Sequence, residues 1–214
     1  MKIFKGLVLT IALLTGGIAA KAQFYQDIQG NAIKENKSAD TEGSPYLLDN
    51  WTAGSATVEK GRYDNIKLKY DIKNDQLIFA GKDDVPMGFA DPVKKFSINN
   101  RNFANGFPAI GAQGKDSYYE VLSDGKVKLL KHYAKHIEEN KTYGSAAVTR
   151  EYTGIETYYV FKDDKMSAIK PDRKNISDLT ADKAAQIDTY LKTNKVNFKN
   201  DASLGQLFDY YNGL

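Results

Sequence analysis

Two histidines, His132 and His136, are the residues whose type and spacing come closest to a recognisable chemical site. On a helix, their H-x-x-x-H spacing would place both rings on one face as metal ligands, with Glu138 or Glu139 as a third ligand. The surrounding residues favour a strand instead, on which the two rings lie about 13 Å apart and cannot share one ion. A lysine precedes each histidine, and its positive charge would oppose a bound cation. We therefore predict no metal site.

Catalytic motifs are equally sparse. A hydrolytic triad would have to use one of the two histidines, and no Gly-x-Ser-x-Gly motif presents a serine. The conspicuous acidic pairs, Asp83-Asp84 and Asp163-Asp164, are placed in apparent turns, where aspartate caps the backbone and stays solvated. A glycoside hydrolase needs only two carboxylates about 5 to 10 Å apart, so a carboxylate-based hydrolase remains an alternative. We assign no catalytic residue.

No cofactor is predicted. The chain has no cysteine, which excludes thiol catalysis, haem attachment through cysteine and thiolate metal ligands. Gly106, Gly111 and Gly114 lie in a glycine-rich stretch, but it matches neither a phosphate-binding loop nor a dinucleotide fingerprint.

The best candidate for ligand contact is an apparent loop over residues 100–114. It carries Phe103, Phe107 and Ile110, three apolar side chains that a simple connection would not need. Loops of about 15 residues are uncommon unless they are functional or disordered. We interpret these three residues as possible ligand or partner contacts, and a flap that covers one end of the sheet as the alternative.

Aromatic doublets provide a second indication of binding. In Tyr118-Tyr119 and Tyr158-Tyr159, successive side chains on a strand point to opposite faces, so we expect one ring of each pair at the surface. Surface tyrosines suit contacts with sugars or proteins, and they also stabilise exposed sheet faces with no ligand bound.

The amino-terminal residues have the pattern of an export signal. Lys2 and Lys5 precede the apolar run Leu7–Leu14, and Ala20-Lys21-Ala22 provides small residues for cleavage. We expect a signal peptide at 1–22, a flexible lead-in at 23–45, a single domain at 46–214, and a location in the periplasm, at the cell surface or outside the cell. The apolar run is shorter than the roughly 20 residues that cross a bilayer, and no transmembrane segment is expected after cleavage.

Charge argues against nucleic acid as a partner. Residues 1–22 contain three lysines and no acid, so removing them leaves 30 − 3 = 27 basic and 27 acidic residues. A protein that binds a phosphate backbone needs a clustered excess of Lys and Arg, which a neutral chain does not provide.

The rest of the chain predicts an α+β fold, in which an antiparallel β-meander, a twisted sheet or partial barrel, is covered by two C-terminal helices. Alternating apolar residues and intervening turns predict three hairpins. Their strands are residues 66–72 with 76–80, 117–122 with 126–133, and 157–162 with 165–169. After Pro171 the period changes to that of a helix, with Thr180 as a possible N-cap. A last helix carries Leu204, Leu207, Phe208 and Tyr211 on one face, although Gly205 should weaken its first turn.

Three short motifs resemble a family of uncharacterised exported proteins of Gram-negative bacteria. They are Gly43-Ser44-Pro45-Tyr46-Leu47 followed by Trp51, the hairpin Ser123-Asp124-Gly125-Lys126, and the ending Leu207-Phe208-Asp209-Tyr210-Tyr211-Asn212. The resemblance covers most of residues 43–214. It implies export and a general fold, and it transfers no activity or functional residue.

Together these observations favour an exported, non-enzymatic binding or structural module of the cell envelope. Its partner would be a protein, a glycan or a lipid. The alternatives are the carboxylate-based hydrolase and a carrier that encloses an apolar ligand between its sheet and its helices.

Overall fold

A computed structural model describes residues 30–33, 40–141 and 148–214. The expected signal peptide at 1–22 lies outside the described residues. Within the expected lead-in, residues 30–32 form a strand, and Glu42 exchanges backbone hydrogen bonds of 2.8 and 3.1 Å with Arg150 and Tyr152.

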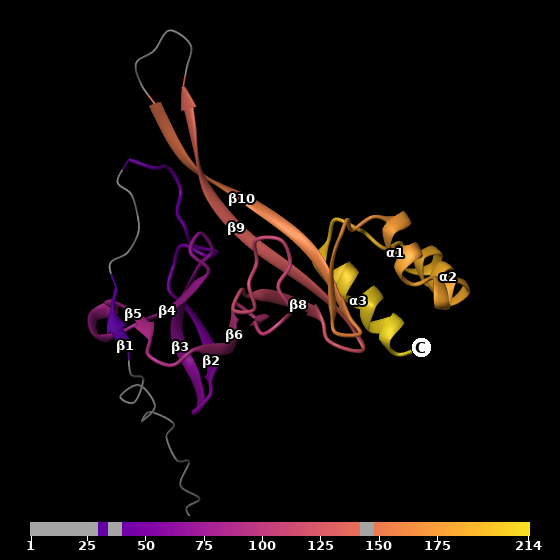
Figure 1. Cartoon of the computed structure of the whole chain (residues 1–214), viewed down its shortest axis with the longest axis horizontal. Helices are drawn as coiled ribbons and strands as arrows, with labels where there is room; N and C mark the ends of the chain where they lie inside the picture. Colours follow the sequence, from indigo (N-terminus) through magenta and orange to yellow (C-terminus); the bar gives the residue numbers. More distant parts are fainter. Residues whose placement is uncertain (1–29, 34–39, 142–147) are drawn as a thin grey trace, which may run out of the picture.

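Eleven antiparallel strands form one open sheet in the order β1-β5-β4-β3-β2-β6-β7-β8-β9-β10-β11 (Figure 1). Their bounds are β1 (Gly30–Ala32), β2 (Thr52–Val58), β3 (Gly61–Asp71), β4 (Gln76–Ala80), β5 (Pro86–Phe89), β6 (Val93–Ile98), β7 (Arg101–Ala104), β8 (Tyr119–Ser123), β9 (Val127–Lys141), β10 (Val148–Lys162) and β11 (Lys165–Ile169). Two meanders, β2–β5 and β6–β11, meet where β2 pairs with β6. The predicted antiparallel α+β fold is confirmed.

Turn chemistry explains where the predicted hairpins begin and end. Residues 76–80 and 165–169 are strands as predicted. Both acidic pairs lie in left-handed backbone, with φ of 58° at Asp83 and Asp84, 49° at Asp163 and 57° at Asp164. Aspartate tolerates this conformation better than most residues, so the prediction that the pairs are turn residues is confirmed.

The two faces of the sheet differ in chemistry. On the first, which we call the core face, Ile66, Leu68, Tyr70, Phe96 and Phe103 form one buried cluster. A second cluster on the same face lies under the carboxyl-terminal helices. On the opposite face, which we call the groove face, β2, β6 and β7 carry mostly polar side chains.

The sheet curls so that the end of β3 meets β9. The backbone N–H of Lys135 donates to the carbonyl of Ile72 over 3.3 Å. The segment before β2 fills this junction, because Leu47 N–H donates to Tyr70 and Ile72 N–H donates to Pro45. The motif at 43–47 is thus part of the closure of the sheet.

Three helices, rather than the predicted two, follow the last strand: α1 (Arg173–Leu179), α2 (Ala184–Asn194) and α3 (Asp201–Asn212). Two 3-10 turns, η2 (Lys82–Asp84) and η3 (Ala181–Lys183), are the other helical elements of the described residues. Thr180 ends α1 instead of capping α2, and its hydroxyl donates to the Ile176 carbonyl over 2.8 Å. The helix predicted after Thr180 therefore corresponds to η3 and α2, and α1 is an additional helix before it.

Helix α3 packs its predicted apolar stripe on the sheet. Leu204, Leu207 and Phe208 are at most 1% exposed. Gly205 has a packing role, since a Cβ there would lie 2.7 Å from the carbonyl oxygen of Leu122. The helix can approach the sheet this closely only because residue 205 has no side chain.

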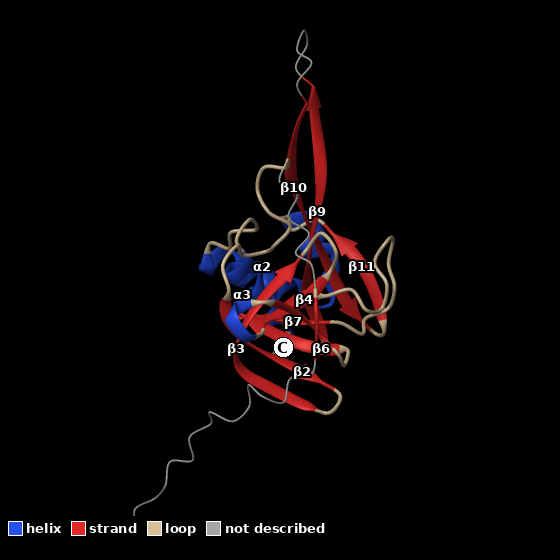
Figure 2. Cartoon of the chain, turned by 90° about the vertical axis from the view of Figure 1, so that its left-hand side faces the viewer, coloured by secondary structure: helices blue, strands red, loops and turns tan. Residues whose placement is uncertain are grey.

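Strands β9 and β10 are far longer than predicted and pair without a break from Val127↔Lys162 to Lys141↔Val148. Their distal halves extend beyond the rest of the sheet as a two-stranded ribbon (Figures 1 and 2). No helix within residues 30–33, 40–141 and 148–214 has the length and apolarity needed to cross a membrane.

Candidate functional site

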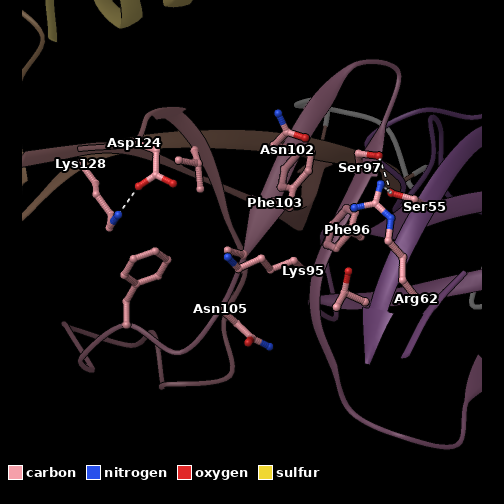
Figure 3. A pocket seen from close by; sticks show the side chains of 14 residues that line it. Ser55, Arg62, Lys95, Phe96, Ser97, Asn102, Phe103, Asn105, Asp124 and Lys128 are labelled. Carbon is pink, nitrogen blue, oxygen red and sulfur yellow. Dashed lines mark hydrogen bonds and ion pairs between the residues drawn. The ribbon is translucent and has the colours of Figure 1, made fainter. Parts of the chain in front are cut away.

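A groove of about 460 Å³ crosses the groove face from β3 to β9 (Figure 3). A volume of this size lies within the range of small-molecule sites. Its lining is mostly polar and comes from six strands, the loop after β7 and the turn between β8 and β9: Ser55, Thr57, Arg62, Lys95, Phe96, Ser97, Asn102, Phe103, Ala104, Asn105, Phe107, Val121, Asp124 and Lys128.

Strand alternation creates this lining. Ser55 pairs with Ser97, and Thr57 pairs with Lys95, so small polar and basic side chains line up on one face. The intervening residues point to the core, where Phe96 and Phe103 stack with ring centroids 4.6 Å apart and 5° between their planes. The floor of the groove is therefore held rigidly from behind.

Three cationic side chains, Arg62, Lys95 and Lys128, line the groove. At one end, Arg62 donates to Asp64 over 2.8 Å and to Ser55 over 3.1 Å, and at the other Lys128 pairs with Asp124 (Figure 3). Lys95 lies between these ends, is exposed, and forms no ion pair with any described residue. Exposed ion pairs contribute less than about 1 kcal/mol, so the paired cations can exchange their acidic partners for a ligand.

The sequence-predicted contact residues divide between two places. Phe103 does not lie in a loop: residues 101–104 are strand β7, and its ring is 1% exposed in the core. That part of the loop prediction is wrong, because β7 has to pair with β6 and β8. Phe107 lines the groove, whereas Ile110 packs beside Phe107 against the cluster described next.

Beneath that loop, on the groove face, lies an aromatic cluster built on Tyr119, Leu130 and Tyr159. The Phe107 ring meets the rings of Tyr119 and Phe161 edge-on, each at 5.5 Å between centroids. The loop therefore covers apolar surface, as the flap interpretation expects.

The tyrosine doublets do not place one ring of each pair at the surface. Tyr118 is 8% exposed and Tyr119 0%, because the loop covers one face while the core occupies the other. Burial raises the pKa of Tyr119 to about 12, and its hydroxyl has no hydrogen-bond partner among the described residues. Tyr159 is buried and Tyr158 is half-buried.

Both histidines lie on β9, as the strand interpretation predicts. His132 is 7% exposed beside Tyr119, with ring centroids 5.4 Å apart, and burial lowers its pKa below the ordinary value. His136 is exposed in the distal half of the strand. No three His, Asp or Glu side chains converge as a metal site among the described residues.

An ion network that no sequence pattern predicted lies on the core face of β7, β8 and β9. Arg101 makes a two-pronged contact with Glu120 at 2.9 and 2.8 Å, and the Tyr133 hydroxyl donates to the same carboxylate over 2.6 Å. Burial and the Glu120 hydrogen bond both raise the pKa of Tyr133, so its hydroxyl remains a donor.

Lys131 extends this network toward α3. Its ammonium group, in a residue 5% exposed, lies 2.7 Å from Glu156 and 2.8 Å from Asp201. Burial disfavours the charged ammonium, but the hydrogen bonds to Asp201 and Glu156 outweigh this effect and raise the pKa of Lys131. Because Asp201 lies on α3 and Lys131 on β9, this ion pair ties α3 to the sheet.

Two of the three short motifs singled out in the sequence have structural partners. The Lys135 ammonium donates to the carbonyls of Ser44 and Tyr46 over 2.9 and 2.7 Å, which fixes the 43–47 segment. At the other end, the Asn212 side chain exchanges two hydrogen bonds with the backbone of Val127. Comparisons with protein-family models, with curated proteins and with solved structures find no match to this chain.

Proposed function

We propose that this protein is an exported, non-enzymatic binding module and that the groove between β3 and β9 is its ligand site. The observation that carries the proposal is the chemistry of the groove lining. Hydroxyl, amide and cationic groups from separate strands face one open space, and Lys95 forms no ion pair with a described residue. A concave site with a few convergent polar groups is typical of ligand recognition.

Export rests on the sequence pattern of residues 1–22, with positive, apolar and small-residue segments in the order of a secretory signal. Amino-terminal sequencing of the protein from the periplasm or the culture medium should begin at Gln23. A chain that begins at Met1 in that material would overturn the proposed export.

Neither alternative function has comparable support. Glu156 and Asp201 converge, but the ammonium of Lys131 lies between them and forms an ion pair with each. A glycosidase instead needs one of its carboxyl groups to hold a proton for the leaving group. The space under the helices is filled by Leu204, Leu207 and other buried side chains, and an apolar cargo would have to displace them.

Asn102→Trp tests the site. Asn102 is exposed on the lining, and an aromatic residue suits a strand, so the substitution fills the groove while the fold is retained. Native mass spectrometry of protein purified from the periplasm should show a bound ligand on wild type and none on Asn102→Trp.

The matched control is Thr149→Trp, which adds the same ring at an exposed position on the distal part of β10. It should retain the ligand. Equal retention by Asn102→Trp would show that the ligand binds elsewhere, and a wild type without ligand would count against a binding role.

A further inference from the structure

We infer that the ligand of the groove is an extended acidic glycan, a chain of sugars with carboxylate groups along its length. This inference rests on the proposed function and adds the chemical class of the ligand. It is drawn from the spacing of the cations and from the neutral groups between them.

The cations lie too far apart for one small anion. Arg62 pairs with Thr57, and Thr57 pairs with Lys95, so Arg62 and Lys95 are two strand spacings apart, about 10 Å. Three further strand spacings, about 14 Å, separate β6 from β9, the strand that carries Lys128. A phosphate or acetate ion would reach one of these groups, whereas an extended polyanion can reach all three.

The charge balance favours an anion over a neutral chain. The lining has three cations, Arg62, Lys95 and Lys128, and one acid, Asp124. Asp64 and Asp124 each neutralise a cation at an end of the groove, both through exposed pairs. Lys95, at the middle, is therefore the position where a ligand carboxylate should bind most strongly.

The groups between the cations suit sugars rather than nucleotides. Ser55, Thr57, Ser97 and Asn102 provide hydroxyls and an amide, which can both donate to and accept from sugar hydroxyls, whereas the amide nitrogen of Asn105 already donates to the Val93 carbonyl. Nucleic acid would require a run of cations along its backbone and aromatic surfaces for successive bases. Phe107 is the one aromatic residue of the lining on the loop, and Phe96 and Phe103 direct their rings into the core.

Isothermal titration calorimetry with three probes tests the inference. The acidic probe is a galacturonate oligosaccharide, the neutral probe is the same oligosaccharide with its carboxyl groups methyl-esterified, and the polyanion control is an oligothymidylate of similar charge. The galacturonate should bind and the other two should not. Raising the ionic strength from about 0.1 M to about 1 M, which shortens the screening length from about 10 Å to about 3 Å, should abolish binding.

Lys95→Glu should weaken galacturonate binding about tenfold or more, because one attraction becomes a repulsion. Lys94→Glu makes the same charge change at an exposed residue of β6 that does not line the groove, and it should leave the affinity unchanged. Lys95→Gln, a milder change, should give an intermediate loss, and circular dichroism confirms that each variant is folded.

Equal binding of the esterified probe or of oligothymidylate would overturn the acidic-glycan assignment. Equal losses in Lys95→Glu and Lys94→Glu would overturn the role of Lys95. No galacturonate binding, together with ligand retention that Asn102→Trp abolishes, would reject the ligand class and leave the groove as the site. Retention that survives in Asn102→Trp would reject the proposed function itself.

Discussion

Replacing Gly125 with alanine should loosen α3 from the sheet by displacing a single side chain. A Cβ at residue 125 would lie 2.4 to 2.8 Å from the side-chain atoms of Asn212, closer than packed atoms can approach. The Asn212 amide accepts from Val127 N–H over 2.9 Å and donates to the Val127 carbonyl over 2.8 Å. It therefore cannot move without breaking these hydrogen bonds.

The cost follows from the two hydrogen bonds and their burial. Losing the bond to the Val127 carbonyl costs about 0.5 to 1.5 kcal/mol, and losing the other, which leaves the N–H of Val127 (3% exposed) unpaired, costs about 1 to 3 kcal/mol. Asn212→Ala should therefore lower the free energy of unfolding by about 2 to 4 kcal/mol. Gly125→Ala should cost about 1 to 3 kcal/mol, because a less flexible unfolded chain returns about 0.4 to 1 kcal/mol.

Urea denaturation of the two single variants and the double variant measures this coupling. If Gly125→Ala acts through Asn212, adding it to Asn212→Ala should break no further contact and should return about 0.4 to 1 kcal/mol, which gives a coupling energy of about 2 to 3 kcal/mol. Gly61→Ala is the control, since no atom lies within 4 Å of a Cβ at that position. Strictly additive costs for Gly125→Ala and Asn212→Ala would refute the reasoning.

Three further predictions concern buried rings. Phe208→Ala should lower the free energy of unfolding by about 3 to 5 kcal/mol in urea denaturation, and a cost below about 1 kcal/mol would mean that α3 does not cover the sheet. Phe103→Ser should lower the melting temperature much more than Phe107→Ser, because the Phe103 ring is 1% exposed and Phe107 is half-buried; equal shifts would contradict this packing. Burial holds the pKa of His132 below its ordinary value. Below about pH 6.5 the unfolded chain therefore binds more protons than the folded one, and the free energy of unfolding decreases as the pH is lowered. His132→Phe should therefore reduce the stability loss between pH 7 and pH 5 in urea denaturation; His136→Phe should not, and an unchanged loss in His132→Phe would contradict the assignment.

The hairpins and the last helix could be predicted because their signals are local. Residues 66–72 alternate between apolar and polar side chains before a turn at Asn74 and Asp75, and the stripe of α3 repeats at the helical period. Thr180 misled the interpretation, since threonine is common at helix starts, but its hydroxyl here bonds back to Ile176 at the end of α1.

The groove could not be predicted, because it depends on pairing between strands distant in the sequence. Thr57 and Lys95 are neighbours only because β2 pairs with β6 across the intervening hairpins. The buried network could not be predicted for the same reason. A lysine on a strand is expected to be exposed, and Lys131 is buried because α3, distant in the sequence, places Asp201 beside it.

Amide hydrogen exchange with and without galacturonate oligosaccharide tests most directly whether the groove is the binding site. We predict slower exchange in β2, β6 and β7, around Thr57, Lys95 and Asn102, and unchanged exchange in α3 and in the distal ribbon of β9 and β10. Protection confined to the ribbon or to α3, or no change at Lys95 and Asn102 under saturating oligosaccharide, would contradict it.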